Sequence, residues 1–117
     1  MSYDISLNDP VTKKPLELVT AHLMRGGIYA IGGTNLAELN ITYNYWPHFT
    51  SLGPKGIREI YDKTGAESIP LLKAAAAFLA DNVDDDYWKP TEGNAKRALL
   101  QLIALAELRP DGVWGGD

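Results

Sequence analysis

Two segments of the chain combine aromatic rings with amide, imidazole and cationic side chains. The first is NITYNYWPHF, residues 40–49, and the second is DYWKPTEGNAKR, residues 86–97. Aromatic walls with a few oriented polar groups are typical of sites that bind a nucleotide or a loop of a partner protein. If the two segments meet in space, they form with Arg25 a candidate binding site of nine residues: Arg25, Tyr43, Asn44, Tyr45, Trp46, His48, Trp88, Lys89 and Arg97.

Each segment also has a purely structural interpretation. In the first, a strand period of two places Asn40, Thr42 and Asn44 on one polar but uncharged face. Because asparagine is disfavoured in strands, these amides either hydrogen-bond loops that cover the sheet or line a shallow binding surface. The structural alternative is favoured, since buried amides are normally satisfied within the protein.

The second segment lies at the start of a predicted helix. Free amides there, together with Lys89, Lys96 and Arg97, are suited to hold an anion. Glu92 argues against this, because its carboxylate would itself occupy the positive end of the helix. An ordinary helix cap with solvated charges is therefore the favoured interpretation.

No motif of a known catalytic or metal centre is complete. Residues 27–34, GIYAIGGT, match a phosphate-binding loop except that Gly33 replaces its lysine, and the glycines are better explained as turns. In the acidic run at 81–86, no register that starts at Asp81, Asn82 or Asp84 supplies both the glycine and the glutamate of a calcium loop. With two histidines and no cysteine, neither a metal site nor a cofactor is expected, and no catalytic residue is assigned.

The favoured function is therefore that of a non-enzymatic binding protein. One alternative is a small enzyme that acts on a nucleotide or glycosyl substrate, with His48 as general base, since a histidine titrates near neutral pH. Another is a structural or assembly protein of a phage particle.

The composition of the chain limits the classes of partner that we expect. The chain has 117 residues, 11 basic against 15 acidic, and a net charge of −4, the wrong sign for neutralising nucleic-acid phosphates. Its longest apolar runs are far below the ~20 residues that span a bilayer, and the start of the chain lacks the features of a secretory signal. We therefore expect a single domain over residues 1–117, cytoplasmic, with nucleic acid an unlikely partner and no membrane contact. The oligomeric state does not follow from the sequence.

Hydrophobic periodicity predicts an α+β fold in which about four antiparallel strands of the first half pack against two or three helices of the second half. Strands are expected at 3–7 and 16–18 as one hairpin, and at 28–31 and 38–45 as another. Helices are expected over 55–63, from a cap at Ser68 to Leu79, and from a cap at Thr91 to Leu108. The first of these is closed by Thr64 and Gly65. Val113 and Trp114 are expected to fold back on the core, and residues 115–117 to fray.

Several stretches of the chain resemble those of a known family over nearly the whole length: MSYDISLNDPVT, NITYNYWPHF, GAESIP, DDDYWKPTEGNAKRAL and RPDGVW. The family comprises small uncharacterised proteins of bacteria and their phages. It has no established activity, so the resemblance assigns no role to any residue. It implies an accessory factor of a mobile element, acting in counter-defence or host takeover, with a host or phage protein as partner.

Overall fold

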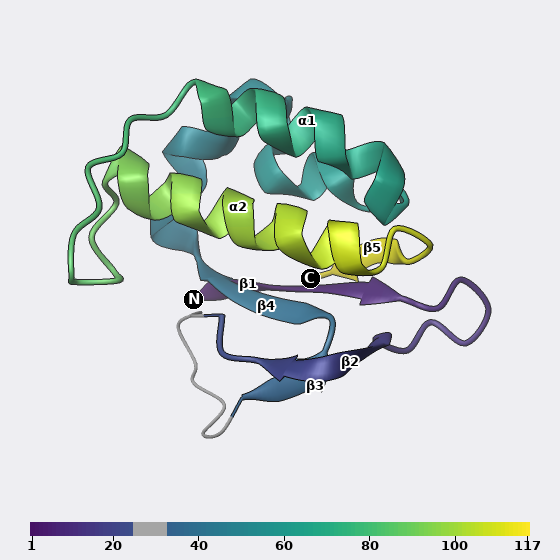
Figure 1. Ribbon diagram of the computed structural model, residues 1–117. Coiled ribbons are helices and arrows are strands. Elements are labelled where there is room, and N and C mark those ends of the chain that lie inside the picture. Colours follow the sequence, from purple (N-terminus) through teal and green to yellow (C-terminus); the bar gives the residue numbers. More distant parts are fainter. Residues whose placement is uncertain (25–32) are drawn as a thin grey trace.

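The computed structural model describes residues 1–24 and 33–117 (Figure 1). Its elements, in chain order, are β1 Ser2–Asn8, β2 Glu17–His22, β3 Thr34–Leu36, β4 Glu38–Thr42, η1 Tyr43–Leu52, η2 Gly56–Ile60, α1 Gly65–Ala77, α2 Glu92–Leu108 and β5 Val113–Gly116, where η marks a 3-10 helix. Antiparallel sheets and helices in this arrangement confirm the predicted α+β class. The strand predicted at 28–31, and Arg25 of the candidate site, lie outside the described residues.

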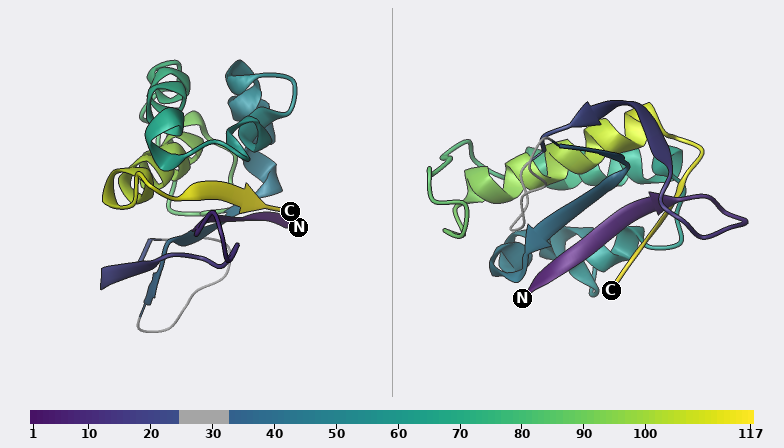
Figure 2. Two further views of the ribbon diagram at one scale, coloured as in Figure 1. Left: turned by 90° about the vertical axis from the view of Figure 1, so that its right-hand side faces the viewer. Right: turned by 90° about the horizontal axis from the view of Figure 1, so that it is seen from below.

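The central sheet has the strand order β4-β1-β5, and the helices pack on one side of it (Figures 1 and 2). Strand β1 shows the period of two expected from its sequence, because Tyr3, Ile5 and Leu7 are all buried in the core. The predicted hairpin between β1 and the second strand is wrong. A single bridge joins Asn8 to Pro15, since β4 and β5 already occupy both edges of β1.

A two-stranded ribbon of β2 and β3 lies on the side of the central sheet away from α1 (Figure 2). Three backbone hydrogen bonds tie this ribbon to the sheet. Leu7 N donates to Ala37 O, Ala37 N to Leu16 O, and Leu16 N to Leu7 O, each with a donor–acceptor distance of 2.8 Å. These bonds close a triangle at the bend between β3 and β4, where Ala37 is fully buried.

The strand predicted over 38–45 ends three residues early, at Thr42. There the Thr42 hydroxyl accepts a hydrogen bond from Asn44 N and caps η1, which contains Pro47. Because the strand ends at this residue, the predicted polar face of Asn40, Thr42 and Asn44 does not form. Thr42 is buried rather than on an outer polar face.

Helix α1 begins earlier than predicted. The Thr64 hydroxyl accepts from Glu67 N, and the Glu67 carboxylate accepts from Thr64 N, so that the two residues form a capping box. Thr64 and Gly65, predicted to close the preceding helix, therefore open this one. The predicted helix over 55–63 is the short 3-10 helix η2.

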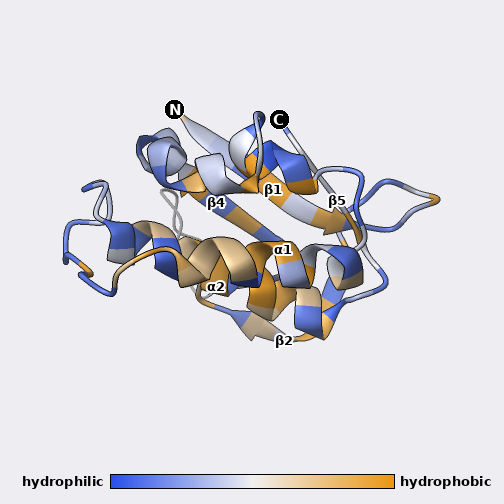
Figure 3. Ribbon diagram, turned by 90° about the horizontal axis from the view of Figure 1, so that it is seen from above, coloured by the Kyte–Doolittle hydropathy of each residue, from blue (hydrophilic) through white to orange (hydrophobic). Residues whose placement is uncertain are grey.

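Helix α2 follows its prediction closely. Thr91 is the N-cap, its hydroxyl accepts from Asn94 N, and the helix ends at Leu108. Seen from the helix side, α2 carries apolar positions along much of its length (Figure 3). In the described part of the chain, no helix has the length and hydropathy that crossing a membrane requires.

The C-terminal segment is part of the core. Trp114 is 1% exposed, which confirms its predicted return to the core. Its Nε1 donates to the Ser68 hydroxyl at a distance of 2.7 Å. The predicted fraying of the residues that follow is wrong for Gly115 and Gly116, which pair with β1. A Cβ at Gly116 would lie 2.3 Å from Asp4 O, so this pairing requires glycine.

The bond between Trp114 and Ser68 gives a first prediction. Ser68→Ala leaves the buried indole N–H without an acceptor and should lower the free energy of unfolding by about 2 kcal/mol. Ser51→Ala, at an exposed serine, is the matched control and should change it by less than about 0.5 kcal/mol. Urea titration of the two variants measures the difference, and equal stabilities would contradict the role of Ser68.

Candidate functional site

The two aromatic segments meet in the structure. Asn44 Nδ2 donates to Trp88 O over 2.8 Å, and His48 Nε2 lies 2.9 Å from Pro90 O. The Tyr45 hydroxyl donates to Tyr87 O. We call the surface formed by residues 44–48 and 86–90 the aromatic junction. The contact between segments on which the sequence hypothesis rested is therefore present.

Tyr87 links this junction to the sheet. Its hydroxyl accepts from Thr42 N over 2.9 Å and lies 3.4 Å from Asn40 O, to which it donates. The Ala37 carbonyl accepts from Leu7 N and Tyr43 N donates to Met1 O, so the odd-numbered residues of this segment face β1. Asn40 and Thr42 therefore direct their backbone groups to the outer edge of β4. One phenol thus bonds both an N–H and a C=O at this outer edge of the strand. Sequence reasoning did not include Tyr87, because nothing local to residues 86–88 indicates a contact with β4.

Asn94 shapes the loop that carries Trp88. The side chain is 1% exposed, and its Nδ2 donates to Asp86 O and to Lys89 O, each over 3.0 Å. Its Oδ1 accepts from Asp84 N over 2.9 Å. One buried amide therefore fixes three backbone groups of residues 84–89, a role that its position in the first turn of the predicted helix did not reveal.

The amides of the first segment are also matched within the protein. Asn40 Nδ2 donates to Ser2 Oγ and Asp4 Oδ1 across the sheet, each over 2.7 Å. The side-chain amide of Asn44 donates to Trp88 O. Both bonds support the structural interpretation of these asparagines over a polar binding face.

The start of α2 is covered by the chain itself. Gly93 N donates to Asn82 Oδ1, and a Cβ at Gly93 would lie 2.5 Å from Asn82 C and from Val83 N. Glu92 turns its carboxylate to Ala80 N. An anion would have to displace these contacts, so the geometry supports the ordinary cap.

Lys89 is engaged by a neighbouring carboxylate. Its Nζ lies 3.3 Å from Asp84 Oδ2. The pKa of Asp84 is lowered, chiefly by the hydrogen bond from Asp86 N and then by Lys89. The ammonium of Lys89, whose side chain is 60% exposed, thus has a carboxylate of its own loop within reach.

Two indoles remain open to solvent at the junction. Trp46 is 56% exposed and Trp88 is 49% exposed, whereas Tyr45, which precedes Trp46 in the chain, is fully buried. The Trp88 and Tyr87 rings are 5.1 Å apart in an edge-to-face arrangement. The junction thus presents large apolar rings on a base whose polar groups are bonded internally.

Tyr43 belongs to a different cluster. Its ring packs edge-to-face on Tyr3 with centroids 4.5 Å apart, and its hydroxyl accepts from Arg58 Nη2 over 3.3 Å. The Arg58 guanidinium also lies 4.9 Å from the Tyr3 ring centroid. Burial raises the pKa of nearby Tyr61 to about 12. Sequence reasoning missed Arg58, which lies fifteen positions from Tyr43 with no pattern to connect them.

The remaining predicted cation, Arg97, lies on α2. Its Nη2 is shielded from solvent and has no hydrogen-bond partner in the part of the chain that the structure describes. It makes no described polar contact with the aromatic junction. Within residues 1–24 and 33–117, no three or more His, Cys, Asp or Glu side chains are grouped to hold a metal ion.

Comparisons with known proteins do not assign the chain to a family. No family model matches it, and no match is found among curated proteins or solved structures. Functional inference therefore depends on the geometry of the chain itself.

The phenol of Tyr87 gives a second prediction. Tyr87→Phe leaves Thr42 N, at a residue 1% exposed, without its acceptor, and should lower the free energy of unfolding by about 2 kcal/mol. Tyr61→Phe, which loses a longer contact of 3.3 Å to Asp117 O, is the control and should cost less than about 1 kcal/mol. Chemical denaturation measures both, and hydrogen exchange at Thr42 should accelerate only in Tyr87→Phe.

Asn94 gives a third prediction. Asn94→Asp replaces a donor by a carboxylate that faces the carbonyls of Asp86 and Lys89, and should cost about 3 kcal/mol at neutral pH. Burial raises the pKa of the introduced carboxyl, so the loss should shrink as the pH falls and the group regains a proton to donate. Asn82→Asp is the control, because its oxygen only accepts from Gly93 N and a carboxylate keeps that bond. A pH-independent deficit at position 94 would contradict this account.

Proposed function

We propose that the protein is a non-enzymatic binding protein whose aromatic junction engages a protein partner. The observation that supports the proposal is the pair of half-exposed indoles, Trp46 and Trp88, on two segments that hydrogen bonds hold together. Tryptophan is enriched among the residues that dominate binding energy at protein interfaces. A base that is already ordered adds to affinity, because little conformational freedom is lost on binding.

A protein partner fits this surface better than a small polar ligand does. A nucleotide site needs a few oriented polar groups beside its apolar walls. Here the amide of Asn44, the imidazole of His48 and the ammonium of Lys89 already have partners within the chain. What remains is the exposed surface of the two indole rings, and the exposed acidic residues Asp85 and Asp86 shortly precede Trp88 in the chain, which favours a partner surface with positive charge.

The enzyme alternative assigned His48 as general base. Its Nε2 lies 2.9 Å from Pro90 O, a contact that orients the ring within the junction. Because a carbonyl only accepts, this contact makes Nε2 an N–H donor and leaves Nδ1 as the basic nitrogen of the ring. The contact supports a structural role for His48 through Nε2, and a general base at this residue would have to act through Nδ1.

The biological setting of the proposal comes from the family resemblance. It favours a host or phage protein as partner and a counter-defence or host-takeover role inside the bacterial cell. The acidic net charge of −4 agrees with a partner other than nucleic acid.

Site-specific photo-crosslinking in bacterial cells tests the proposal. A photoreactive phenylalanine analogue at position 46 or 88 should give the same covalent adduct with one protein. The same analogue at position 11 should not, because Val11 is 86% exposed but lies in the loop after β1, outside the junction.

Binding of the captured protein then provides the quantitative measure. Trp46→Ser together with Trp88→Ser should weaken the affinity about 30-fold or more, whereas Val11→Ser should leave it unchanged. Circular dichroism controls for folding. Absence of an adduct at both tryptophan positions, or equal adducts at position 11, would refute the proposal.

A further inference from the structure

The backbone carbonyls of the loop that carries Trp88 are all bonded within the chain. Each of the five carbonyls of residues 86–90 accepts a hydrogen bond from a side chain. Three donors come from η1 and one, which bonds two of the carbonyls, from α2: Asn44, Tyr45 and His48, and Asn94. A partner that approaches this loop therefore meets carbonyl oxygens that already have a donor.

Two carboxylates of the same loop keep open oxygens. Asp86 Oδ1 accepts from Trp88 N at 3.0 Å, and its Oδ2 has no partner in the part of the chain that the structure describes. Asp85 is exposed, and neither of its carboxylate oxygens has a partner among those same residues. The acceptors left to a partner are thus carboxylates, and one of them is bonded to the backbone of the residue whose indole is 49% exposed.

The loop also has an excess of negative charge. Residues 84–90 contain three aspartates and one lysine. The Lys89 ammonium lies 3.3 Å from Asp84 Oδ2, so these two charges oppose each other. Within residues 1–24 and 33–117, Asp85 and Asp86 have no cation in contact to balance them. Charge complementarity therefore favours a cation on the partner.

We propose that the partner binds the aromatic junction through an arginine side chain, whose guanidinium stacks on the Trp88 indole and donates to the Asp86 carboxylate. A guanidinium is planar and weakly hydrated, so it stacks on an aromatic face while its N–H groups bond a carboxylate. The ammonium of lysine is compact and strongly hydrated, and fits such a site less well. This inference rests on the proposed function, because it names the group by which the partner is held.

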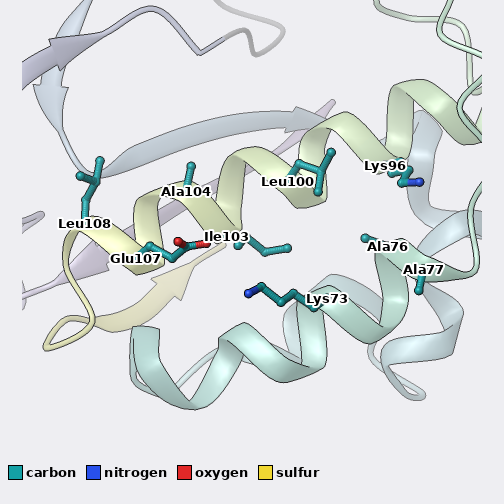
Figure 4. Close-up of a pocket in the computed structure, with 9 residues that line it drawn as sticks. All are labelled: Lys73, Ala76, Ala77, Lys96, Leu100, Ile103, Ala104, Glu107 and Leu108. Atoms are coloured by element: carbon teal, nitrogen blue, oxygen red, sulfur yellow. The ribbon is translucent and has the colours of Figure 1, made fainter.

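A groove between α1 and α2 provides a contrasting surface on the same molecule (Figure 4). It has a volume of about 700 Å³, and none of the described residues that line it is aromatic. Its charged residues are Lys73, Lys96 and Glu107, an excess of one cation. A guanidinium meets neither a ring nor an excess of negative charge there, so this groove serves as a control surface.

Nuclear magnetic resonance of the whole chain tests the proposal, with N-acetylarginine amide as the probe. At pH 7 and constant ionic strength, the indole N–H signal of Trp88 should shift and saturate. The lysine analogue should bind at least about threefold more weakly, and the uncharged citrulline analogue should give no saturable shift. The indole signal of buried Trp114 and the methyl signals of Leu100 and Ile103 in the groove should not move.

A matched pair of variants tests the carboxylate. Asp86→Asn keeps an oxygen that accepts from Trp88 N but removes the charge, and should weaken binding of the arginine probe at least about threefold. Asp9→Asn is the control, because Asp9 Oδ1 likewise accepts from Val11 N and Thr12 N in the loop after β1. The same charge is removed there at the same kind of contact, and the affinity should not change.

Equal binding of the arginine and citrulline probes, no saturable shift with any probe, or equal affinities of the Asp86→Asn and Asp9→Asn variants would overturn the proposal. The photo-crosslinking experiment distinguishes this failure from failure of the proposed function. A captured partner that binds both variants equally well would leave the proposed function in place and refute the arginine contact. Absence of any adduct at positions 46 and 88 would refute the protein partner itself, even if the arginine probe binds.

Discussion

The hydroxyl of Tyr87 is the contact on which the candidate site depends. It accepts from Thr42 N and donates to Asn40 O, and so takes the place of a neighbouring strand at the outer edge of β4. An exposed strand edge is a template for pairing with other chains, and proteins usually cover or interrupt it. Here the cover is the loop before α2, and the same contact holds Trp88 against the sheet end where η1 begins.

The polar groups of the junction are used to build it. Asn94 fixes the loop from within, Asn44 and His48 bond its carbonyls, and Asn82 closes the start of α2. Because each bond removes a donor or acceptor that a ligand would need, the surface keeps its rings and loses much of its capacity for polar recognition. This is the physical reason that the junction favours a protein partner over a nucleotide.

The sequence by itself determined those elements that depend on residues close together in the chain, such as helix caps and hydrophobic periodicity. The cap at Thr91, the helical period up to Leu108 and the α+β class follow from such signals, although the capping box at Thr64 was read as a helix end. Tertiary structure alone decided that β1 pairs with β4 and β5, that Tyr87 covers the edge of β4, and that Arg58 joins Tyr43. The residues that make these contacts are far apart in the chain. Which of them pair depends on which polar groups are still without a hydrogen bond once the core has packed, and this cannot be determined from neighbouring residues.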